Sequence, residues 1–302
     1  MGSCGRWDAT PPATEVEIVT SKVIFLFGVT GSGKTSRALG YAREQAALGV
    51  RVEIVNADSR QIYKGLPVLS ACPTAAEYAE FPHHLFEFLA LDEPYSAGRY
   101  GREARAVVDD IVARGAVPLV VGGTGFYFTA LEGLPEVPAV PVAELKARYG
   151  HMSVDALAAR VREVDPDWWT AANDSERRNP QRMMRVLGVA EVTGTLMSGY
   201  GATRGDFREV YEVEQWVMMR EREELKARLR ERVDAGFEAM KAEVAAVMAR
   251  GLTDDAPGLQ TLGFADLAAC VRGEITDEDA KALLLKGHVG YAKRQETWGR
   301  KL

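Results

Sequence analysis

One glycine-rich segment combines the residue types that bind phosphate groups. Residues 28–35 read Gly-Val-Thr-Gly-Ser-Gly-Lys-Thr and match the pattern G-x-x-x-x-G-K-[ST]. Glycines let consecutive backbone N–H groups curve around an anion, the lysine supplies a positive charge, and the threonine hydroxyl can ligate Mg²⁺. The pattern predicts a binding loop for a di- or triphosphate. It leaves open whether the protein transfers a phosphate to a substrate or releases the phosphate as a leaving group. Its expected ligand-binding members are Gly28, Thr30, Gly31, Ser32, Gly33, Lys34 and Thr35, with Thr35 as the metal ligand.

Two further polar or glycine-rich segments follow apolar runs. Asp58 comes shortly after the run 52–55, and Gly122-Gly123-Thr124-Gly125 follows the run 117–121. If these runs are parallel strands, their carboxyl ends meet at one edge of the sheet, where open α/β folds place their sites. We expect Asp58 to face the phosphate loop from the neighbouring strand and to accept a proton from a nucleophile or hold Mg²⁺ through water. Aspartate also caps turns and helices, so its residue type leaves both roles open.

The surrounding pattern predicts an α/β fold with a parallel sheet of the P-loop NTPase type, flanked by helices. Because strands that alternate with helices need crossover connections, they form a parallel sheet. Strand-like runs occupy 23–27, 52–55, 117–121 and 210–217, and helical patterns occupy 35–48, 99–114, 221–250, 264–271 and 277–300.

The middle of the chain follows a different pattern. Apolar residues from about 141 to 201 repeat at helical spacing, with glycine- and proline-containing segments at 133–141 and 198–205. We therefore expect an inserted helical subdomain at 141–201 within a core formed by 21–140 and 202–302. Residues 1–20 are expected to be a disordered leader.

Composition excludes several classes of protein. The 302 residues are 47% hydrophobic, too many for a disordered chain, and no uninterrupted apolar run approaches the ~20 residues that span a bilayer. The N-terminus lacks the features of a secretory signal. Three widely spaced cysteines match no zinc or Cys-x-x-Cys pattern and fit a reducing compartment. We expect a cytoplasmic protein without a membrane partner, and a monomer.

Basic residues gather in two segments, although the net charge is −6. Such clusters form either a basic stripe for nucleic acid or a solvated helix face paired with neighbouring glutamates, and charge alone leaves both readings open. The first segment contains Arg177, Arg178, Arg182 and Arg185, and the second contains Arg220, Arg222, Lys226, Arg228, Arg230 and Arg232.

The sequence from Val23 to Leu302 resembles the tRNA dimethylallyltransferases, also called tRNA isopentenyltransferases. The resemblance begins with the phosphate loop and continues through six further motifs in the same order. These are Ala-Asp-Ser-Arg-Gln-Ile-Tyr at 57–63, Pro-His-His-Leu at 82–85, Tyr-Ser-Ala at 95–97, Val-Gly-Gly-Thr-Gly-Phe-Tyr at 121–127, Asn-Pro-Gln-Arg-Met-Met-Arg at 179–185 and Tyr-Ala-Lys-Arg-Gln-Glu-Thr-Trp at 291–298.

The resemblance implies transfer of a dimethylallyl group from dimethylallyl diphosphate to N6 of adenosine 37, in tRNAs that read codons beginning with U. It implies Asp58 as the general base, Thr124 as a further catalytic residue and Arg228 as the arginine at the diphosphate, with Arg222 and Arg232 as open alternatives. Mg²⁺ and the diphosphate would lie at the phosphate loop. The implied tRNA-binding residues, for the anticodon stem-loop, are Ser59, Arg60, Gln61, Thr124, Gln181, Arg182 and Arg185.

Some positions depart from the family pattern. Cys72 replaces a lysine, the start of the inserted region around 143–146 lacks a common arginine, Gly188 replaces a glutamate, and Gly299 replaces an aromatic or apolar residue. The departures concern individual tRNA contacts more than the reaction.

Three other functions remain as alternatives. An adenylate isopentenyltransferase would modify a free nucleotide. A small-molecule kinase would bind ATP at the loop and use Asp58 to activate a hydroxyl. A nucleotide-binding switch would have no catalytic role, and both it and the kinase would bind ATP tightly.

Overall fold

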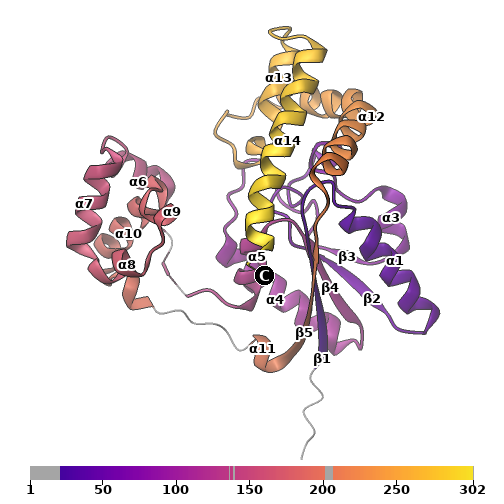
Figure 1. Ribbon diagram of the computed structural model, residues 1–302, viewed down its shortest axis with the longest axis horizontal. Helices are drawn as coiled ribbons and strands as arrows, with labels where there is room; N and C mark the ends of the chain where they lie inside the picture. Colours follow the sequence, from indigo (N-terminus) through magenta and orange to yellow (C-terminus); the bar gives the residue numbers. More distant parts are fainter. Residues whose placement is uncertain (1–20, 136, 139, 201–206, 302) are drawn as a thin grey trace, which may run out of the picture.

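The computed structural model describes residues 21–135, 137–138, 140–200 and 207–301 (Figure 1). The expected leader at 1–20, including Cys4, and part of the second border of the inserted region lie outside the described residues.

A parallel five-stranded sheet forms the centre of the larger part of the molecule, which confirms the predicted fold class. Its strands stand in the order β3-β2-β4-β1-β5, and every paired neighbour is parallel. The expectation that the Asp58 strand neighbours that of the phosphate loop is wrong, because β4 lies between β2 and β1. The strands are β1 (Ser21–Gly28), β2 (Val52–Asn56), β3 (His83–His84), β4 (Val117–Gly122) and β5 (Tyr211–Met218).

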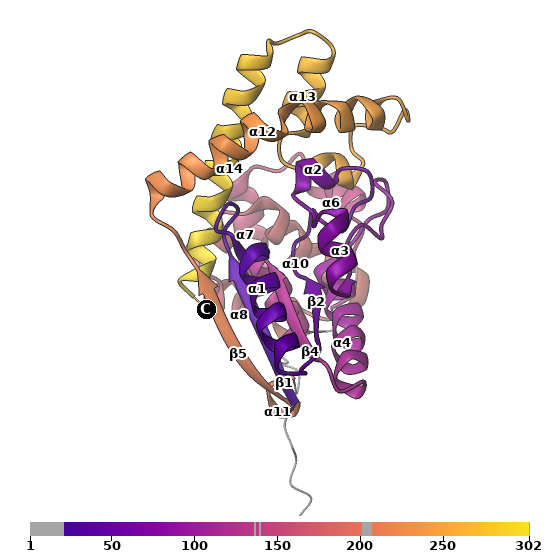
Figure 2. The ribbon, with the colours of Figure 1, turned by 90° about the vertical axis from the view of Figure 1, so that its right-hand side faces the viewer.

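Helices cover both faces of this sheet (Figure 2). Successive side chains of β1 alternate between two cores, because neighbouring strand residues point to opposite faces. Phe25 packs with α4 (Ala97–Ala113) and α5 (Gly125–Glu132), whereas Ile24 and Leu26 pack with α1 (Lys34–Ala47). A strand buried on both faces explains the continuous apolar run at 23–27.

Further helices stand at the carboxyl ends of the strands, at the top of Figure 1. The two long ones, α12 (Arg222–Met248) and α14 (Asp277–Gly299), contact each other, and α13 (Phe264–Val271) packs against both. The short elements in this part are α2 (Pro67–Ser70) and the 3₁₀ turn η2 (Pro257–Gln260), whereas α3 (Ala75–Glu80) lies beside the edge strand β3, where Tyr78 packs against His83. Helices from the last third of the chain therefore cover this end of the sheet.

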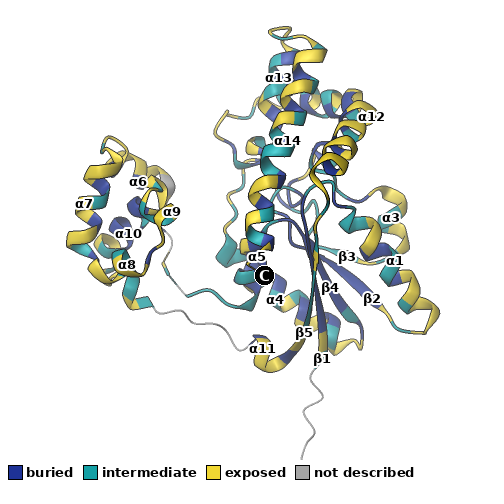
Figure 3. Ribbon diagram, in the orientation of Figure 1, coloured by how far each residue is buried: buried dark blue, intermediate teal, exposed yellow. Residues whose placement is uncertain are grey.

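The inserted region forms a group of helices beside the sheet (Figure 1). Buried residues of α7 and α10, including Leu157, Val161 and Met183, form an apolar core of its own, which Figure 3 shows inside the group. The elements are α6 (Val142–Tyr149), α7 (Val154–Val164), α8 (Pro166–Ala171), α9 (Asp174–Arg177), α10 (Pro180–Thr193) and the 3₁₀ turn η1 (Met197–Tyr200), after which α11 (Phe207–Val210) leads into β5.

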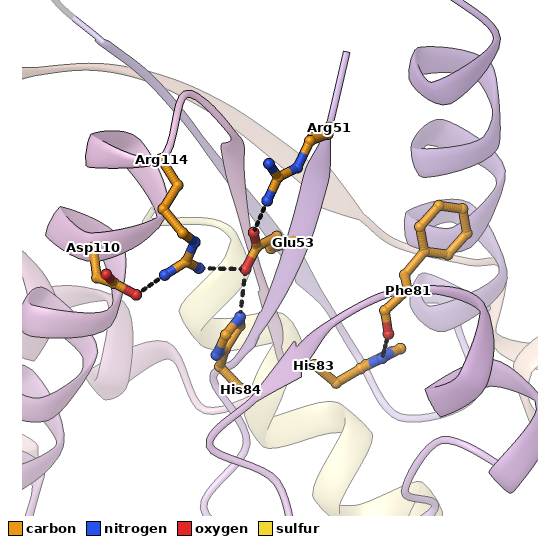
Figure 4. A network of polar contacts seen from close by, with 7 residues as sticks. All are labelled: Arg51, Glu53, Phe81, His83, His84, Asp110 and Arg114. Carbon is orange, nitrogen blue, oxygen red and sulfur yellow. Dashed lines mark hydrogen bonds and ion pairs between the residues drawn. The ribbon is translucent and has the colours of Figure 1, made fainter. Parts of the chain in front are cut away.

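A buried carboxylate ties the short edge strand β3 to the rest of the sheet (Figure 4). Glu53 on β2 accepts hydrogen bonds from Arg114 Nη2 at 2.7 Å and Arg51 Nη2 at 3.3 Å, and its Oε2 lies 2.8 Å from His84 Nε2. Burial alone would raise the pKa of Glu53, but the hydrogen bonds with His84 and Arg114 outweigh it and lower the pKa. His83 bonds the Phe81 carbonyl, so both histidines anchor the chain.

Candidate active site at the carboxyl edge of the sheet

The phosphate loop lies between β1 and α1, as its pattern requires. Gly31 and Gly33 have φ angles of +80° and +88°, in the left-handed region that favours glycine. Helix α1 begins at Lys34, so the last two residues of the loop form its first turn, and its N-terminal N–H groups and positive dipole end point at the space the loop encloses. This geometry is suited to an anion.

A pocket of about 520 Å³ opens beside the loop. Its lining combines the phosphate loop with α12 and the residue after α2. The lining residues are Thr30, Gly31, Gly33, Lys34, Thr35, Ala71, Arg228, Glu231, Arg232 and Ala235. Burial lowers the pKa of Lys34 and of Arg232, and the charge of Arg232 lowers that of Lys34 further. The pocket therefore holds cations that an anionic ligand would stabilise.

Arginines of α12 and of the segment before it hold the phosphate loop by its carbonyl groups. Arg228 Nε donates to the Gly31 carbonyl at 3.1 Å, and Arg220 Nε donates to the Ser32 carbonyl at 2.7 Å. Arg232 donates to the carbonyl of Leu69 at 2.9 Å. The sequence left three candidates for the arginine at the diphosphate. Of these, Arg228 and Arg232 line the pocket and Arg222 does not. The sequence did not single out Arg220 as a partner of the loop.

Asp58 lies in the segment after β2, near two of the cations that line this pocket. It is 8% exposed, and its Oδ1 accepts the backbone N–H of Arg60 at 3.0 Å, so the residue does cap a turn. Its charge also acts on the pKa values of Lys34 and Arg232, opposing their downward shifts. The carboxylate therefore lies close to the cations of the pocket, and capping does not exclude a catalytic role.

Thr124 connects the segments that follow β2 and β4. Its hydroxyl accepts the backbone N–H of Ser59 at 3.0 Å and lies 3.2 Å from the Ser59 hydroxyl. Burial raises the pKa of Tyr291 of α14 to about 12; the Asp58 charge adds to the shift, and an interaction with Thr124 opposes it. Tyr291 therefore lies close enough to Asp58 and Thr124 to belong to the site.

Gln295 of α14 is the site residue that sequence reasoning missed most clearly. Its side chain is 3% exposed, accepts the N–H of Thr30 at 2.8 Å and donates to the Gly123 carbonyl at 2.9 Å. A Cβ at Gly123 would lie 2.2 Å from the Gln295 amide nitrogen and would displace the amide from these hydrogen bonds. Gln295 thus joins the two glycine-rich segments, and its place in the 291–298 motif was the available signal.

The remaining residues expected at tRNA fall into two groups. Arg60 Nη1 donates to the Pro257 carbonyl at 3.1 Å, and Gln61 is buried with its amide nitrogen donating to the Ser70 and Ala71 carbonyls. Gln181 and Arg182 are exposed on α10, where Arg182 pairs with Glu176, and Arg185 is half-buried. The structure brings Ser59, Arg60 and Gln61 together with Asp58, whereas the second group lies on the inserted helices.

Two of the family departures have a packing explanation. A Cβ at Gly188 would lie 2.2 Å from Leu145 Cδ2, and one at Gly299 would lie 2.0 Å from Met219 Cε. Neighbouring side chains therefore occupy the space that a larger residue would need. Cys72 lies near the site as a neutral thiol, because burial raises its pKa to about 12.

A Mg²⁺ ion fits the donor set of the pocket when a phosphate is present. Thr35 lines the pocket and supplies a hydroxyl oxygen, and Mg²⁺ at such loops takes its other ligands from phosphate oxygens and water. Within the described ranges, no cluster of three or more His, Cys, Asp or Glu residues could hold a metal by itself. The phosphate loop is therefore the expected place for the ion.

The helices of the described part of the chain include none that is long and apolar enough to cross a membrane.

Comparison with known proteins identifies the family. The tRNA dimethylallyltransferase of Desulfovibrio desulfuricans is 38% identical, over 98% of this chain and 89% of its own length. The crystal structure of a tRNA isopentenylpyrophosphate transferase from Bacillus halodurans superposes with a TM-score of 0.63 at 28% identity, covering 93% of this chain and 88% of that one. A eukaryotic dimethylallyltransferase structure shares the fold, with a TM-score of 0.75 at 23% identity over 92% and 70% of the two chains. Residues 61–302 match the IPP transferase family, and the protein belongs to that family.

Proposed function

We propose that the protein transfers a dimethylallyl group from dimethylallyl diphosphate to N6 of adenosine 37, in tRNAs that read codons beginning with U. Family membership supports the reaction class, since the similar bacterial proteins are named tRNA dimethylallyltransferases. The observation that carries the mechanism is that Asp58 lies close enough to Lys34 and Arg232 to act on their pKa values. A proton acceptor therefore lies near the anion site.

Asp58 serves as the general base. The adenine amino nitrogen is a weak nucleophile because its lone pair is delocalised into the ring. As N6 attacks the allylic carbon, the Asp58 carboxylate takes the N6 proton, a contribution of about 10²–10⁴-fold in rate. Asn56 and Arg60 fix the turn, with Asn56 Oδ1 accepting the Asp58 N–H at 2.8 Å, so the carboxylate is held in place before the substrate arrives.

The phosphate loop holds the leaving group. When the C–O bond of dimethylallyl diphosphate breaks, its electron pair goes to the diphosphate oxygen, and the negative charge grows at the pocket. Lys34, Arg228 and Arg232 stabilise that charge. Bound at Thr35, Mg²⁺ would supply further charge stabilisation of the diphosphate.

The tRNA is held by two separate parts of the molecule. The target base must leave its stack to reach Asp58, at a cost of a few kcal/mol that contacts to the protein offset. Ser59, Arg60, Gln61 and Thr124 act beside the base, and the α10 residues Gln181, Arg182 and Arg185 act on the anticodon stem-loop. We further propose that the enzyme works as a monomer in the cytoplasm.

The test is transfer of label from radiolabelled dimethylallyl diphosphate, with Mg²⁺, to unmodified tRNA carrying A36-A37-A38. The expected result is label in the tRNA that Asp58→Asn reduces by about 10²-fold or more, while Asp92→Asn, at an exposed site outside the pocket, leaves it unchanged. Label in AMP alone would show an adenylate isopentenyltransferase instead. Transfer or hydrolysis of ATP phosphate without any prenyl transfer would show a kinase-like or NTPase activity and contradict the proposal.

A further inference from the structure

The hydrogen-bonded ladder between β1 and β4 ends before the candidate site begins. Its last registered pair is Phe27 with Gly122, so the phosphate loop and the segment after β4 emerge where the ladder no longer joins them. Ladder hydrogen bonds hold only the residues that they pair, and segments beyond the ladder need other contacts to keep a fixed separation. The position of the loop relative to this segment therefore depends on side chains from elsewhere in the chain.

Gln295 of α14 supplies such a contact. Its Oε1 accepts the Thr30 N–H at 2.8 Å, its Nε2 donates to the Gly123 carbonyl at 2.9 Å, and the side chain is buried. A side-chain amide carries an acceptor and a donor on one rigid plane, so it can bridge a backbone N–H and a backbone carbonyl. Gln295 thus continues the connection between the two strands beyond the end of their ladder.

The segment after β4 is in turn bonded to the residues on either side of Asp58. The Thr124 N–H donates to the Ala57 carbonyl at 3.1 Å, and the Thr124 hydroxyl accepts the Ser59 N–H at 3.0 Å. These two bonds hold the backbone around Asp58 against the segment that Gln295 contacts. A continuous series of contacts therefore runs from the phosphate loop through Gln295 to the carboxylate.

The shape of the phosphate loop has separate support. Arg228 of α12 donates to the Gly31 carbonyl at 3.1 Å. Arg220, two residues before α12, donates to the Ser32 carbonyl at 2.7 Å. These bonds attach the loop to a different element from the helix that carries Gln295. Without the Gln295 amide, the loop would keep its curvature but could shift relative to the general base.

We propose that Gln295 is a positioning residue that fixes the distance between the diphosphate at the phosphate loop and the carboxylate of Asp58. The inference rests on the proposed function, in which N6 bonds to the allylic carbon, the N6 proton goes to Asp58, and the electron pair of the broken C–O bond goes to the diphosphate. Both ends must be aligned at once, and a displacement of about 1 Å lowers the rate by about 10²-fold. Binding of the diphosphate alone needs no such alignment.

The test is a double-mutant cycle on the single-turnover rate of prenyl transfer to tRNA, with the full chain in excess. Gln295→Met keeps the length of the side chain and removes both hydrogen bonds. We expect it to lower the rate by about 10- to 100-fold in wild type, and by less than about 3-fold in Asp58→Asn, where no carboxylate remains to be aligned. Gln45→Met, in the last turn of α1, should leave both rates unchanged.

Titration with inorganic pyrophosphate and Mg²⁺ separates positioning from binding. The Kd of Gln295→Met should stay within about 3-fold of the wild-type value, because Arg220 and Arg228 still hold the loop. Gly123→Ala tests the same bridge from its other end. Its Cβ would lie 2.2 Å from the Gln295 amide nitrogen, so we expect the same loss of rate, again confined to the background that retains Asp58.

Two outcomes would overturn this inference and leave the proposed function intact. One is an equal fold loss of rate for Gln295→Met in wild type and in Asp58→Asn, which would show a role in the fold alone. The other is a loss of pyrophosphate affinity as large as the loss of rate, which would show a role in binding. A wild-type protein that transfers no prenyl group to tRNA would contradict both the inference and the proposed function.

Discussion

At the residue scale, the site depends on side chains that hold cations around the phosphate loop. Arg228 and Arg232 line the pocket, and both already donate to backbone carbonyl groups, as does Arg220. An arginine has five N–H donors, so each can keep its carbonyl partner and still bind a phosphate oxygen. The loop is thereby held in shape by the same groups that neutralise the ligand.

Arg228→Gln is expected to weaken pyrophosphate binding by about 10- to 100-fold, because a charged hydrogen bond to the ligand is lost. Isothermal titration at fixed ionic strength measures the change in Kd. Arg222→Gln is the matched control, since Arg222 is exposed on the same helix and does not line the pocket. Equal weakening by both substitutions would show that general charge, and not contact at the pocket, governs affinity.

Glu53→Gln is expected to lower the free energy of unfolding by about 1–3 kcal/mol at pH 7, because the neutral amide loses the charged hydrogen bonds with two arginines and the bond with His84. The lowered pKa of Glu53 means that its contribution is present above the ordinary carboxyl pKa and is lost as pH falls through the folded-state value. Urea unfolding at pH 7 and pH 3 should therefore show that the free energy of unfolding changes less with pH in the variant than in wild type. Glu44→Gln, in an exposed pair with Arg37, should change stability by about 0.5 kcal/mol or less.

At the element scale, helix packing explains one residue that departs from the family pattern, Gly188. Gly188 lets α6 approach α10 so closely that Leu145 occupies the place of a side chain. The departure from the family pattern is therefore part of the core of the inserted helices.

Gly188→Glu, which restores the residue typical of the family, is expected to destabilise the inserted helices by about 3 kcal/mol or more, because it adds a charged side chain to a filled core. Thermal unfolding followed by Trp168 and Trp169 fluorescence measures this region, since both tryptophans pack against its core. Leu145→Ala in the same chain should recover part of the loss. Gly40→Ala on α1, where no atom lies within 4 Å of the added Cβ, should instead stabilise by up to about 1 kcal/mol.

The sequence predicted most elements, but not how they are ordered. Apolar runs and helical spacing locate four of the five strands and the long helices, because local patterns reflect burial on one or two faces. The two-residue strand β3 is too short to give a pattern, and the insertion of β4 between β2 and β1 depends on crossovers that no run of residues encodes. Contacts such as Arg220 with Ser32 join residues 188 positions apart, so spacing could not reveal them.

At the scale of the whole molecule, the candidate site residues occupy two parts. Asp58, Thr124 and the phosphate loop follow the carboxyl ends of β2, β4 and β1, whereas Arg182 and Arg185 belong to α10 of the inserted helices, which have a separate core. A substrate that touches both groups must be large, which accords with a folded RNA and not with a free nucleotide.

Replacing Arg182 and Arg185 together by glutamate is expected to weaken tRNA binding by at least about 10-fold at 0.1 M salt and to reduce the dependence of log Kd on log salt by about 1–2. Pyrophosphate affinity should not change, because neither residue lines the phosphate pocket. Filter binding over a salt series gives both the Kd for tRNA and the slope of log Kd against log salt. Arg160→Glu, at an exposed arginine of α7, controls for net charge, and an equal loss with that variant would contradict a specific role for α10.

The bridge formed by Gln295 has a consequence for biosynthesis. Thr30 emerges from the ribosome early, but the amide that holds its N–H is translated 265 residues later. At about 5–20 residues per second, ~13–53 s separate the two. During that interval the nascent phosphate loop lacks the partner that joins it to the Gly123 turn, so the loop reaches its final shape only after translation has passed Gln295.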